Sequence, residues 1–325
     1  MSLRDLVVEF PTRRGVLRAL DGVSLDVGAG EILGVVGESG AGKSITGAAI
    51  IGLIEPLGRI AGGEIRFKGE RTDNLAPEAM ARLRGKRIGM IFQDPLTSLN
   101  PLFTVGQQLT ETIEHHLKLG PAKARARAID LLAEVGIPAP EIRIDHYPHQ
   151  FSGGMRQRVV IALALSPEPE FVIADEPTTA LDVSVQAQVI KVFRRMCREY
   201  GTSAILITHD MGVIAEAADR VAVLYSGRVA EVGTVRDVLK HPRHPYTRGL
   251  MGSIPSLTGD ADRLEQIPGA MPRLNAIPRG CAFNPRCSEV MEICRVKRPP
   301  LIELEGGTRA ACWLYGDKLP EDAAG

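Results

Sequence analysis

A chain of 325 residues, of which 44% are apolar, is long enough for two domains and a sizeable core, which excludes a disordered protein. Its 39 basic residues balance 39 acidic ones, so no net charge attracts a nucleic acid or an anionic membrane surface. The longest purely apolar run that we find, from Val159 to Leu165, is far shorter than the ~20 residues of a spanning helix, and the N-terminus MSLRDLVVEF lacks a signal-type apolar region. These features predict a soluble, cytoplasmic protein.

Short apolar runs separated by turn residues predict strands in the first part of the chain. They are LVVEF, VSLDV, ILGVV, GEIRFKG and KRIGMIF. Between Thr104 and Gly136 the periodicity becomes helical, with Ala128, Leu131, Leu132 and Val135 on one face, which predicts a helical insertion.

Strands and helices alternate in the following part of the chain. The predicted elements are strand FVIAD, helix VSVQAQVIKVFRRMCREY, strand SAILIT, a short helix from Met211 and the strand pair DRVAVLYSG and RVAEVG. Alternation at these lengths predicts an α/β fold with a mostly parallel sheet. Beyond about Leu250 proline and glycine increase and periodicity fades, which predicts a small, loop-rich appendage.

The stretch GESGAGKS lies between the apolar runs ILGVV and ITGAAIIGLI, so we expect a loop between a strand and a helix. It matches G-x-x-x-x-G-K-[ST], a loop whose backbone N–H groups surround a polyphosphate at a helix N-terminus. Lys43 would reach the outer phosphates and Ser44 would bind Mg²⁺. The alternative is a glycine turn with an exposed lysine. The candidate phosphate-binding residues are Gly37, Glu38, Ser39, Gly40, Ala41, Gly42, Lys43 and Ser44.

Two acidic residues, Asp175 and Glu176, end the buried-type strand of FVIADEP. Ligands of open α/β sheets lie at the carboxyl ends of the strands, so this position places two acids beside the phosphate loop. Asp175 would hold Mg²⁺ and its waters, and Glu176 would polarise the attacking water as a general base. The alternative is two solvated acids at a strand end.

The stretch FSGGMRQR precedes the predicted helix VVIALAL and offers a second anion site. The hydroxyl of Ser152, the backbone of Gly153 and Gly154, and the unpaired N–H groups of a helix start are its components. A single ATP does not need two such sites in one chain.

Five motifs in this order resemble the ATPase subunit of an ABC transporter over about residues 1 to 245. They are the phosphate loop, FSGGM, FVIADEP, TALD (residues 179–182) and ITHD (residues 207–210). The resemblance implies the α/β fold of a P-loop NTPase, with a β-rich subdomain, a helical subdomain inserted at about residues 94–165, and ATP and Mg²⁺ as ligands. It also implies head-to-tail pairing, in which the phosphate loop of one ATPase faces the SGG segment of the other.

The same resemblance implies roles for three further residues. Gln93 matches the glutamine that touches Mg²⁺ and the water, although it could be a strand-ending amide only. His209 matches the histidine that contacts the γ-phosphate and supports Glu176, and the alternative is an ordinary packed or surface histidine. Asp182 matches the acid that crosses the dimer interface, and it is equally a candidate N-cap of the next helix.

The sequence departs from the family pattern at two places. FSGGM replaces the commonest form LSGGQ, so Met155 cannot make the hydrogen bonds of that glutamine. The aromatic residue that usually stacks on adenine is missing from TRRGVL, which leaves Phe10 or the guanidinium of Arg14 as candidates.

A finer resemblance, to the ATPase subunits of oligopeptide and dipeptide importers, rests on FQDPLTSLNP, HPRHPYTRGLM and the cysteine tail. It divides the chain into an ATPase domain, 1–245, and an extension, 246–325. The residues of HPRHPYTRGL alone predict a proline-broken connector that leaves the sheet. It implies a second ATPase subunit, distinct or identical, two transmembrane permease subunits, indirectly a solute-binding protein, and no nucleic acid. The expected location is peripheral, on the cytoplasmic face of the inner membrane.

Alternatives to peptide import stay open at this point. The subgroup also contains nickel and oligosaccharide uptake systems, and the direction of transport is decided by the membrane subunits. Soluble ABC proteins of DNA repair carry a long coiled coil or zinc insertions, and those of translation carry two ATPase domains in one chain. This sequence has neither feature.

Four of the five cysteines gather near the C-terminus, which suggests a bound metal or cluster and not a disulfide framework. They are Cys281, Cys287, Cys294 and Cys312. Four thiolates suit either Zn²⁺ or an iron–sulfur cluster, and no C-x-x-C pair is present to favour zinc. The resemblance implies a [4Fe–4S] cluster with a structural role, with Zn²⁺ as the second candidate and free thiols as the third.

Overall fold

A computed structural model describes residues 1–13, 15–179, 181–253 and 266–318. The chain divides into two compact units. Unit 1 comprises Met1, Val27–Ile32 and Asn74–Thr208, and unit 2 comprises Ser2–Asp26, Leu33–Asp73 and the described residues from His209 onward.

Unit 1 is built on parallel strands in the order β8-β7-β6. Their bounds are β6 (Ile88–Ile91), β7 (Phe171–Asp175) and β8 (Ser203–Ile207). Every residue of β7 and β8 is buried. Continuous apolar runs of this kind are typical of parallel strands that are covered on both faces.

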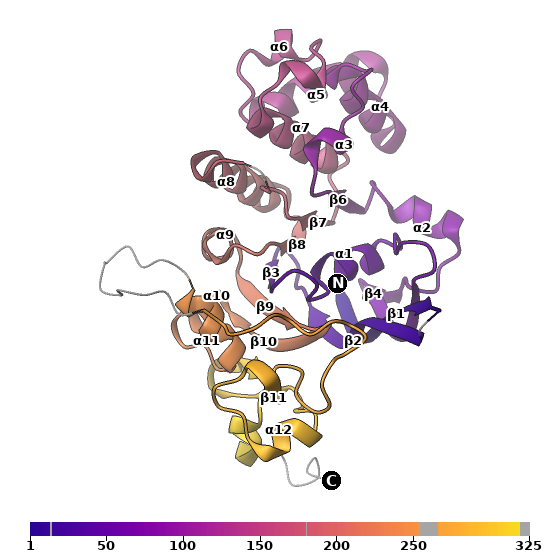
Figure 1. The fold of residues 1–325 in the computed structure, drawn as a ribbon. Coiled ribbons are helices and arrows are strands. Elements are labelled where there is room, and N and C mark those ends of the chain that lie inside the picture. Colours follow the sequence, from indigo (N-terminus) through magenta and orange to yellow (C-terminus); the bar gives the residue numbers. More distant parts are fainter. Residues whose placement is uncertain (14, 180, 254–265, 319–325) are drawn as a thin grey trace. The chain divides into compact units, whose positions relative to one another are not determined.

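The helices of unit 1 include one cluster, formed by α3 to α7 (Figure 1). The bounds are α2 (Pro77–Leu83), α3 (Pro95–Ser98), α4 (Val105–Leu117), α5 (Pro121–Glu134), α6 (Pro140–Arg143), α7 (Gly153–Leu165) and α8 (Val183–Tyr200). Helix α4 begins with a capping box between Thr104 and Gln107. The predicted apolar face of α5 is confirmed, because Ala128, Leu131 and Leu132 are fully buried. The predicted helical insertion is therefore present.

Unit 2 contains an antiparallel sheet in the order β2-β1-β4-β5 and a second sheet portion in the order β11-β12-β10-β9-β3. In the second, β3 pairs in parallel with β9, and the other pairings are antiparallel. The bounds are β1 (Ser2–Thr12), β2 (Gly15–Asp26), β3 (Ile32–Val36), β4 (Arg59–Phe67), β5 (Glu70–Arg71), β9 (Arg220–Tyr225), β10 (Arg228–Thr234), β11 (Ile302–Glu303) and β12 (Arg309–Ala310). The predicted β-rich surroundings of the phosphate loop are confirmed.

The expected proline-broken connector at HPRHPYTRGL is wrong, because its second half is a helix. The helices of unit 2 are α1 (Lys43–Ile50), α9 (Met211–Ala217), α10 (Val235–Lys240), α11 (Pro245–Gly252) and α12 (Glu292–Val296). Pro245 occupies the first turn of α11, where a missing N–H costs nothing, and His244 caps that turn by accepting from the Tyr246 N–H. Tyr246 is fully buried, so packing holds the helix in place.

The C-terminal tail has few regular elements, as expected, yet it is attached to the sheet of unit 2. Strand β12 pairs with β10, and β11 pairs with β12. Ile302, Leu304 and Ala310 form a small apolar cluster against which Tyr315 packs. Within the described residues, no helix combines the length and the apolar character that a membrane span requires.

Candidate functional site

The backbone of the phosphate loop leaves no space for side chains where it leaves β3 and where it enters α1. Gly37 has φ +151°, and a Cβ atom there would lie 2.3 Å from the carbonyl oxygen of Leu224. Gly42 has φ +102°, and its Cβ would lie 2.7 Å from the Leu20 side chain. Both glycines are required because any other residue would combine a clash with a strained φ. The backbone N–H groups of the loop can therefore approach an anion closely.

The Lys43 ammonium lies inside the loop. Lys43 is only 6% exposed. Its Nζ donates to the carbonyl oxygens of Gly37, at 2.8 Å, and Glu38, at 3.1 Å. The alternative of a turn with an exposed lysine is thus wrong. Ser44 is exposed in the first turn of α1. A buried ammonium beside a helix N-terminus and an accessible hydroxyl suit a polyphosphate with a divalent cation.

His209 lies beside the start of the phosphate loop in unit 2. It lines a cavity of about 380 Å³ together with Val36, Gly37 and Glu38. Its side chain is exposed, so the alternative of a packed histidine is wrong, whereas a surface position is what the structure has. Ser39 and Gly40 are exposed at the tip of the loop, and Ala41 is buried.

The carboxylate of Glu176 is held by two neighbours in unit 1. Thr179 Oγ1 donates to Glu176 Oε2 at 2.9 Å, and Gln93 Nε2 donates to the same oxygen at 3.3 Å. Glu176 has φ +46°, a conformation that costs energy in a residue with a side chain, and its N–H donates to the Ile207 carbonyl at 2.9 Å. Asp175, directly before it, is 8% exposed. Neither acid is simply solvated, which argues against that alternative.

Ser152 caps helix α7 and is exposed. Its side chain accepts from the Met155 N–H at 3.4 Å. The two following glycines differ in their surroundings: a Cβ on Gly153 would lie 3.4 Å from Leu181, whereas one on Gly154 would lie 2.3 Å from Val185 of α8. The second glycine is therefore required for close helix packing, while Ser152 and Gly153 remain at the accessible helix start.

Asp182 occupies the N-cap position of α8, but its side chain accepts no capping hydrogen bond. The expectation that it caps this helix through its carboxylate is therefore wrong. The side chain is exposed, as a residue that acts across an interface requires.

The structure describes one of the two candidates for adenine stacking, Phe10. The Phe10 ring lies against Gly58, where a Cβ would be 2.6 Å from its Cε1 atom, so that ring has a packing role within unit 2. Arg14 lies outside the described residues.

The four tail cysteines lie in unit 2, and all four have free thiols. The Cys281 N–H donates to the Cys294 carbonyl at 2.9 Å, and Asn284 Nδ2 donates to the Cys281 carbonyl at 2.8 Å. Burial, and then the charges of Cys294 and Cys287, raise the pKa of Cys281 to about 11. Burial, and then the charges of the other three thiolates, also raise the pKa of Cys312 to about 11.

The chemistry of this donor set fits a metal or cluster, since several thiolates ionise together only beside a cation. The positions of the side chains do not by themselves form a metal site. Within the described residues, no three histidine, cysteine, aspartate or glutamate side chains are grouped closely enough to hold a metal ion.

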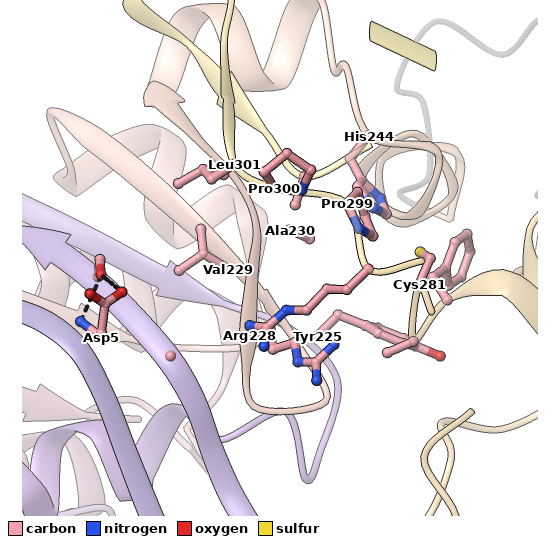
Figure 2. Close-up of a pocket in the computed structure, with 16 residues that line it drawn as sticks. Asp5, Tyr225, Arg228, Val229, Ala230, His244, Cys281, Pro299, Pro300 and Leu301 are labelled. Atoms are coloured by element: carbon pink, nitrogen blue, oxygen red, sulfur yellow. Dashed lines mark hydrogen bonds between the residues drawn. The ribbon is translucent and has the colours of Figure 1, made fainter. Parts of the chain in front are cut away.

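A larger cavity of unit 2, of about 480 Å³, lies beside β10 and the tail (Figure 2). Arg228, His244 and Cys281 are among the residues that line it. Burial lowers the pKa of His244 to about 4, so this imidazole is neutral at pH 7. Among the described residues that form its wall, none belongs to the phosphate loop, so this cavity is distinct from the predicted nucleotide site.

Three residues near the predicted sites were missed in the sequence. Thr179 holds Glu176, the Tyr246 hydroxyl accepts from the Glu38 N–H of the phosphate loop, and Arg286 pairs with Glu38. Thr179 and Arg286 each lie next to or within a recognised motif, three residues after Glu176 and directly before Cys287. The sequence shows the residue types of Thr179 and Arg286, but it does not show which residues they contact.

Comparison with known proteins identifies two regions of the chain. The ABC transporter family matches residues 20–179, and the C-terminal region of oligopeptide/dipeptide transporters matches residues 230–294. The dimeric ATP-binding cassette MJ0796, in a post-hydrolysis state bound to ADP and Pi, has a TM-score of 0.65 and 27% identity, and the match covers 72% of this chain and 98% of that one. The predicted α/β ABC ATPase fold is confirmed.

Two curated relatives match almost the entire chain. The oligopeptide transport ATP-binding protein OppD of Bacillus subtilis (strain 168) is 47% identical over 323 residues, which are 99% of this chain and 90% of that protein. The dipeptide transport ATP-binding protein DppD of Escherichia coli (strain K12) is 43% identical, over 96% of this chain and 95% of that protein. This chain is therefore an ABC transporter ATPase and belongs to the family of ATP-binding subunits of oligopeptide and dipeptide transporters.

Proposed function

We propose that this ATPase powers the uptake of oligopeptides or dipeptides through partner transmembrane subunits, by ATP-driven closing and opening of a dimer. The observation that carries the proposal is the presence, in one chain, of the phosphate loop and a tail of the peptide-transporter type. Nickel and oligosaccharide uptake are the alternatives within the same subgroup.

In the proposed reaction, residues 37–44 and His209 bind the phosphates of ATP. Glu176 accepts a proton from water as the water oxygen attacks the γ-phosphorus, and ADP leaves with the electron pair of the broken P–O bond. The hydrogen bonds from Gln93 and Thr179 support this role because they fix the orientation of the Glu176 carboxylate. Oxygen atoms of Ser44, Gln93 and Asp175 are the proposed ligands of Mg²⁺, which neutralises phosphate charge when bound.

The proposed dimer uses Ser152, Gly153, Gly154 and Asp182 of each ATPase toward the nucleotide of the other. The exposed start of α7 supports this role, because a helix N-terminus offers unpaired N–H groups to an anion. The second ATPase is a copy of this chain or a distinct relative.

The proposed contact with the permease subunits lies at residues 92–103 of unit 1. Four large apolar side chains are exposed there, which is more than scattered surface residues explain. They are Phe92 at 47%, Leu96 at 61%, Leu102 at 79% and Phe103 at 49%. Docking at this surface would give a peripheral location on the cytoplasmic face of the inner membrane, with a solute-binding protein on the other side.

For the tail we propose a [4Fe–4S] cluster on Cys281, Cys287, Cys294 and Cys312, with Zn²⁺ as the second candidate. Four free thiols within one short tail support it. The small apolar cluster at Ile302, Leu304 and Ala310 also supports it, since a tail with so little core gains most from a cross-link.

Transport assays separate the proposed solutes. In cells that lack the chain, uptake of labelled di- and oligopeptides should be lost and should return with the intact gene, while Ni²⁺ uptake should be unchanged. Loss of Ni²⁺ or oligosaccharide uptake with normal peptide uptake would refute peptide import.

Glu176→Gln should keep MgATP binding and lower ATP turnover by ~10²-fold or more, the scale expected when a general base is lost. Glu199→Gln, on the exposed face of α8, is the matched control and should retain normal turnover. Turnover of Glu176→Gln close to that of the unmodified protein would refute the proposed base.

Lys43→Ala and Ser152→Arg should each reduce turnover in the transporter by about tenfold or more, since each removes part of a phosphate site. Mixed, the two variants should regain part of the activity if the chain pairs with itself, because one composite site stays intact. If the partner is a distinct ATPase, the two changes are divided between the two proteins. Unchanged turnover in Ser152→Arg would contradict the shared site.

Anaerobically purified protein should be brown, with about four irons and four sulfides per chain. Cys287→Ser should lose the colour and increase proteolysis of the tail, whereas MgATP should still bind. Cys197→Ala is the control, because Cys197 is buried in α8 of unit 1 and should leave the colour unchanged. Colourless protein with one Zn²⁺ would favour the second candidate, and metal-free protein with four titratable thiols would refute both.

A further inference from the structure

The segment between the first two tail cysteines, Cys281 and Cys287, contacts the phosphate loop through an ion pair. Arg286 Nη1 donates to both carboxylate oxygens of Glu38, at 3.0 and 3.1 Å. The Arg286 side chain is 7% exposed and that of Glu38 is 29% exposed. The pair is thus largely shielded from water, where charge-assisted hydrogen bonds are strong.

Arg286 has a fixed position on the tail side of this contact. Its Nε donates to the Pro268 carbonyl at 2.9 Å, and Nη1 also lies 3.3 Å from the Tyr225 hydroxyl. The guanidinium carbon is 5.9 Å from the centre of the Tyr225 ring and 6.0 Å from that of Phe283. These contacts orient the guanidinium toward Glu38 with little freedom to move.

Glu38 is also held through its backbone. Its N–H donates to the Tyr246 hydroxyl at 2.9 Å, and its carbonyl oxygen accepts from Lys43 Nζ. The ring of Tyr246 packs edge-on against Tyr225, with centres 4.6 Å apart, and Phe283 lies 5.4 Å from Tyr246. The tail therefore reaches the loop through a connected set of rings and through one guanidinium.

The negative charge of Glu38 links its ion pair with Arg286 to nucleotide binding. A carboxylate in a loop that receives a polyphosphate repels its ligand unless a cation neutralises it. Arg286 supplies that cation and holds the carboxylate at one place. An unpaired Glu38 would be free to turn toward the phosphates and would also compete for Lys43.

We propose that Arg286 is a positioning residue for MgATP: it holds and neutralises Glu38, so that the fold of the cysteine tail controls the nucleotide affinity of the phosphate loop. The inference rests on the ATP binding of the proposed function and adds a control element to it. Because binding couplings are reciprocal, nucleotide must also stabilise the segment around Arg286.

The first test is a double-mutant cycle on MgATP affinity, measured by titration calorimetry with the full chain. Arg286→Met should weaken binding about tenfold, the size expected for one charge-assisted contact. Glu38→Gln should cost less, and the double variant should bind more tightly than Arg286→Met because the unpaired carboxylate is gone. Losses that add in the double variant, or an Arg286→Met affinity within about twofold of the unmodified protein, would overturn the proposal.

Arg298→Met is the matched control. Arg298 belongs to the same tail and donates to the Asp21 carbonyl, not to a residue of the phosphate loop, so its loss should change MgATP affinity by less than about twofold. If Arg286→Met does not fold, Arg286→Lys and Glu38→Gln carry the test, and Arg286→Lys should keep part of the affinity of the unmodified protein since the positive charge remains. An unmodified protein that does not bind MgATP at all would instead refute the proposed function.

The second test measures the reciprocal effect by amide hydrogen exchange of residues 279–296. A non-hydrolysable ATP analogue with Mg²⁺ should slow exchange in this segment of the unmodified protein. The same ligand, at saturation, should have no such effect in Arg286→Met. Equal protection in both proteins would show that the coupling does not pass through Arg286 and would overturn the proposal.

Discussion

The arrangement of unit 2 depends on the narrow space around the phosphate loop. At Gly37 the carbonyl of Leu224 in β9, and at Gly42 the side chain of Leu20 in β2, lie too close for a Cβ atom. A backbone hydrogen bond also fixes the loop, since the Gly227 N–H donates to the Ala41 carbonyl at 2.9 Å. Strands that are distant in sequence are thus packed onto one loop, and its backbone N–H groups are left to face a ligand.

The buried Lys43 side chain supports the shape of the loop from within. Loop carbonyl oxygens accept hydrogen bonds from its ammonium, so the positive charge is satisfied within the loop and lies at the proposed phosphate site. Glu38 takes part in the same network and carries the contact to Arg286 and Tyr246. The tail is in this sense part of the loop's support, and β12 joins it to the sheet beside β10.

In unit 1 the residues proposed to be functional have a different physical character. Glu176 is in a costly backbone conformation and has two side-chain donors, which is typical of a group that is held for a reaction. Ser152 and Asp182, in contrast, are exposed at the starts of two helices. A fixed acid within the unit and exposed groups at its surface fit an enzyme whose site is completed by a partner.

The sequence by itself determined the elements and the chemistry of the separate motifs, because buried strands, glycine turns and helix caps are local patterns. It predicted β7 with Asp175 and Glu176 at its end, the glycine loop before α1, and α5 with its apolar face.

The sequence could not determine contacts between distant residues. Prolines indicated a break at residues 241–250, yet the second half of this segment is a helix in which Tyr246 is buried. Arg286 and Glu38 are separated by 248 positions, and Gly154 is required because of Val185. Only the tertiary structure decided these features, since they arise from packing and charge pairing between segments that no local pattern connects.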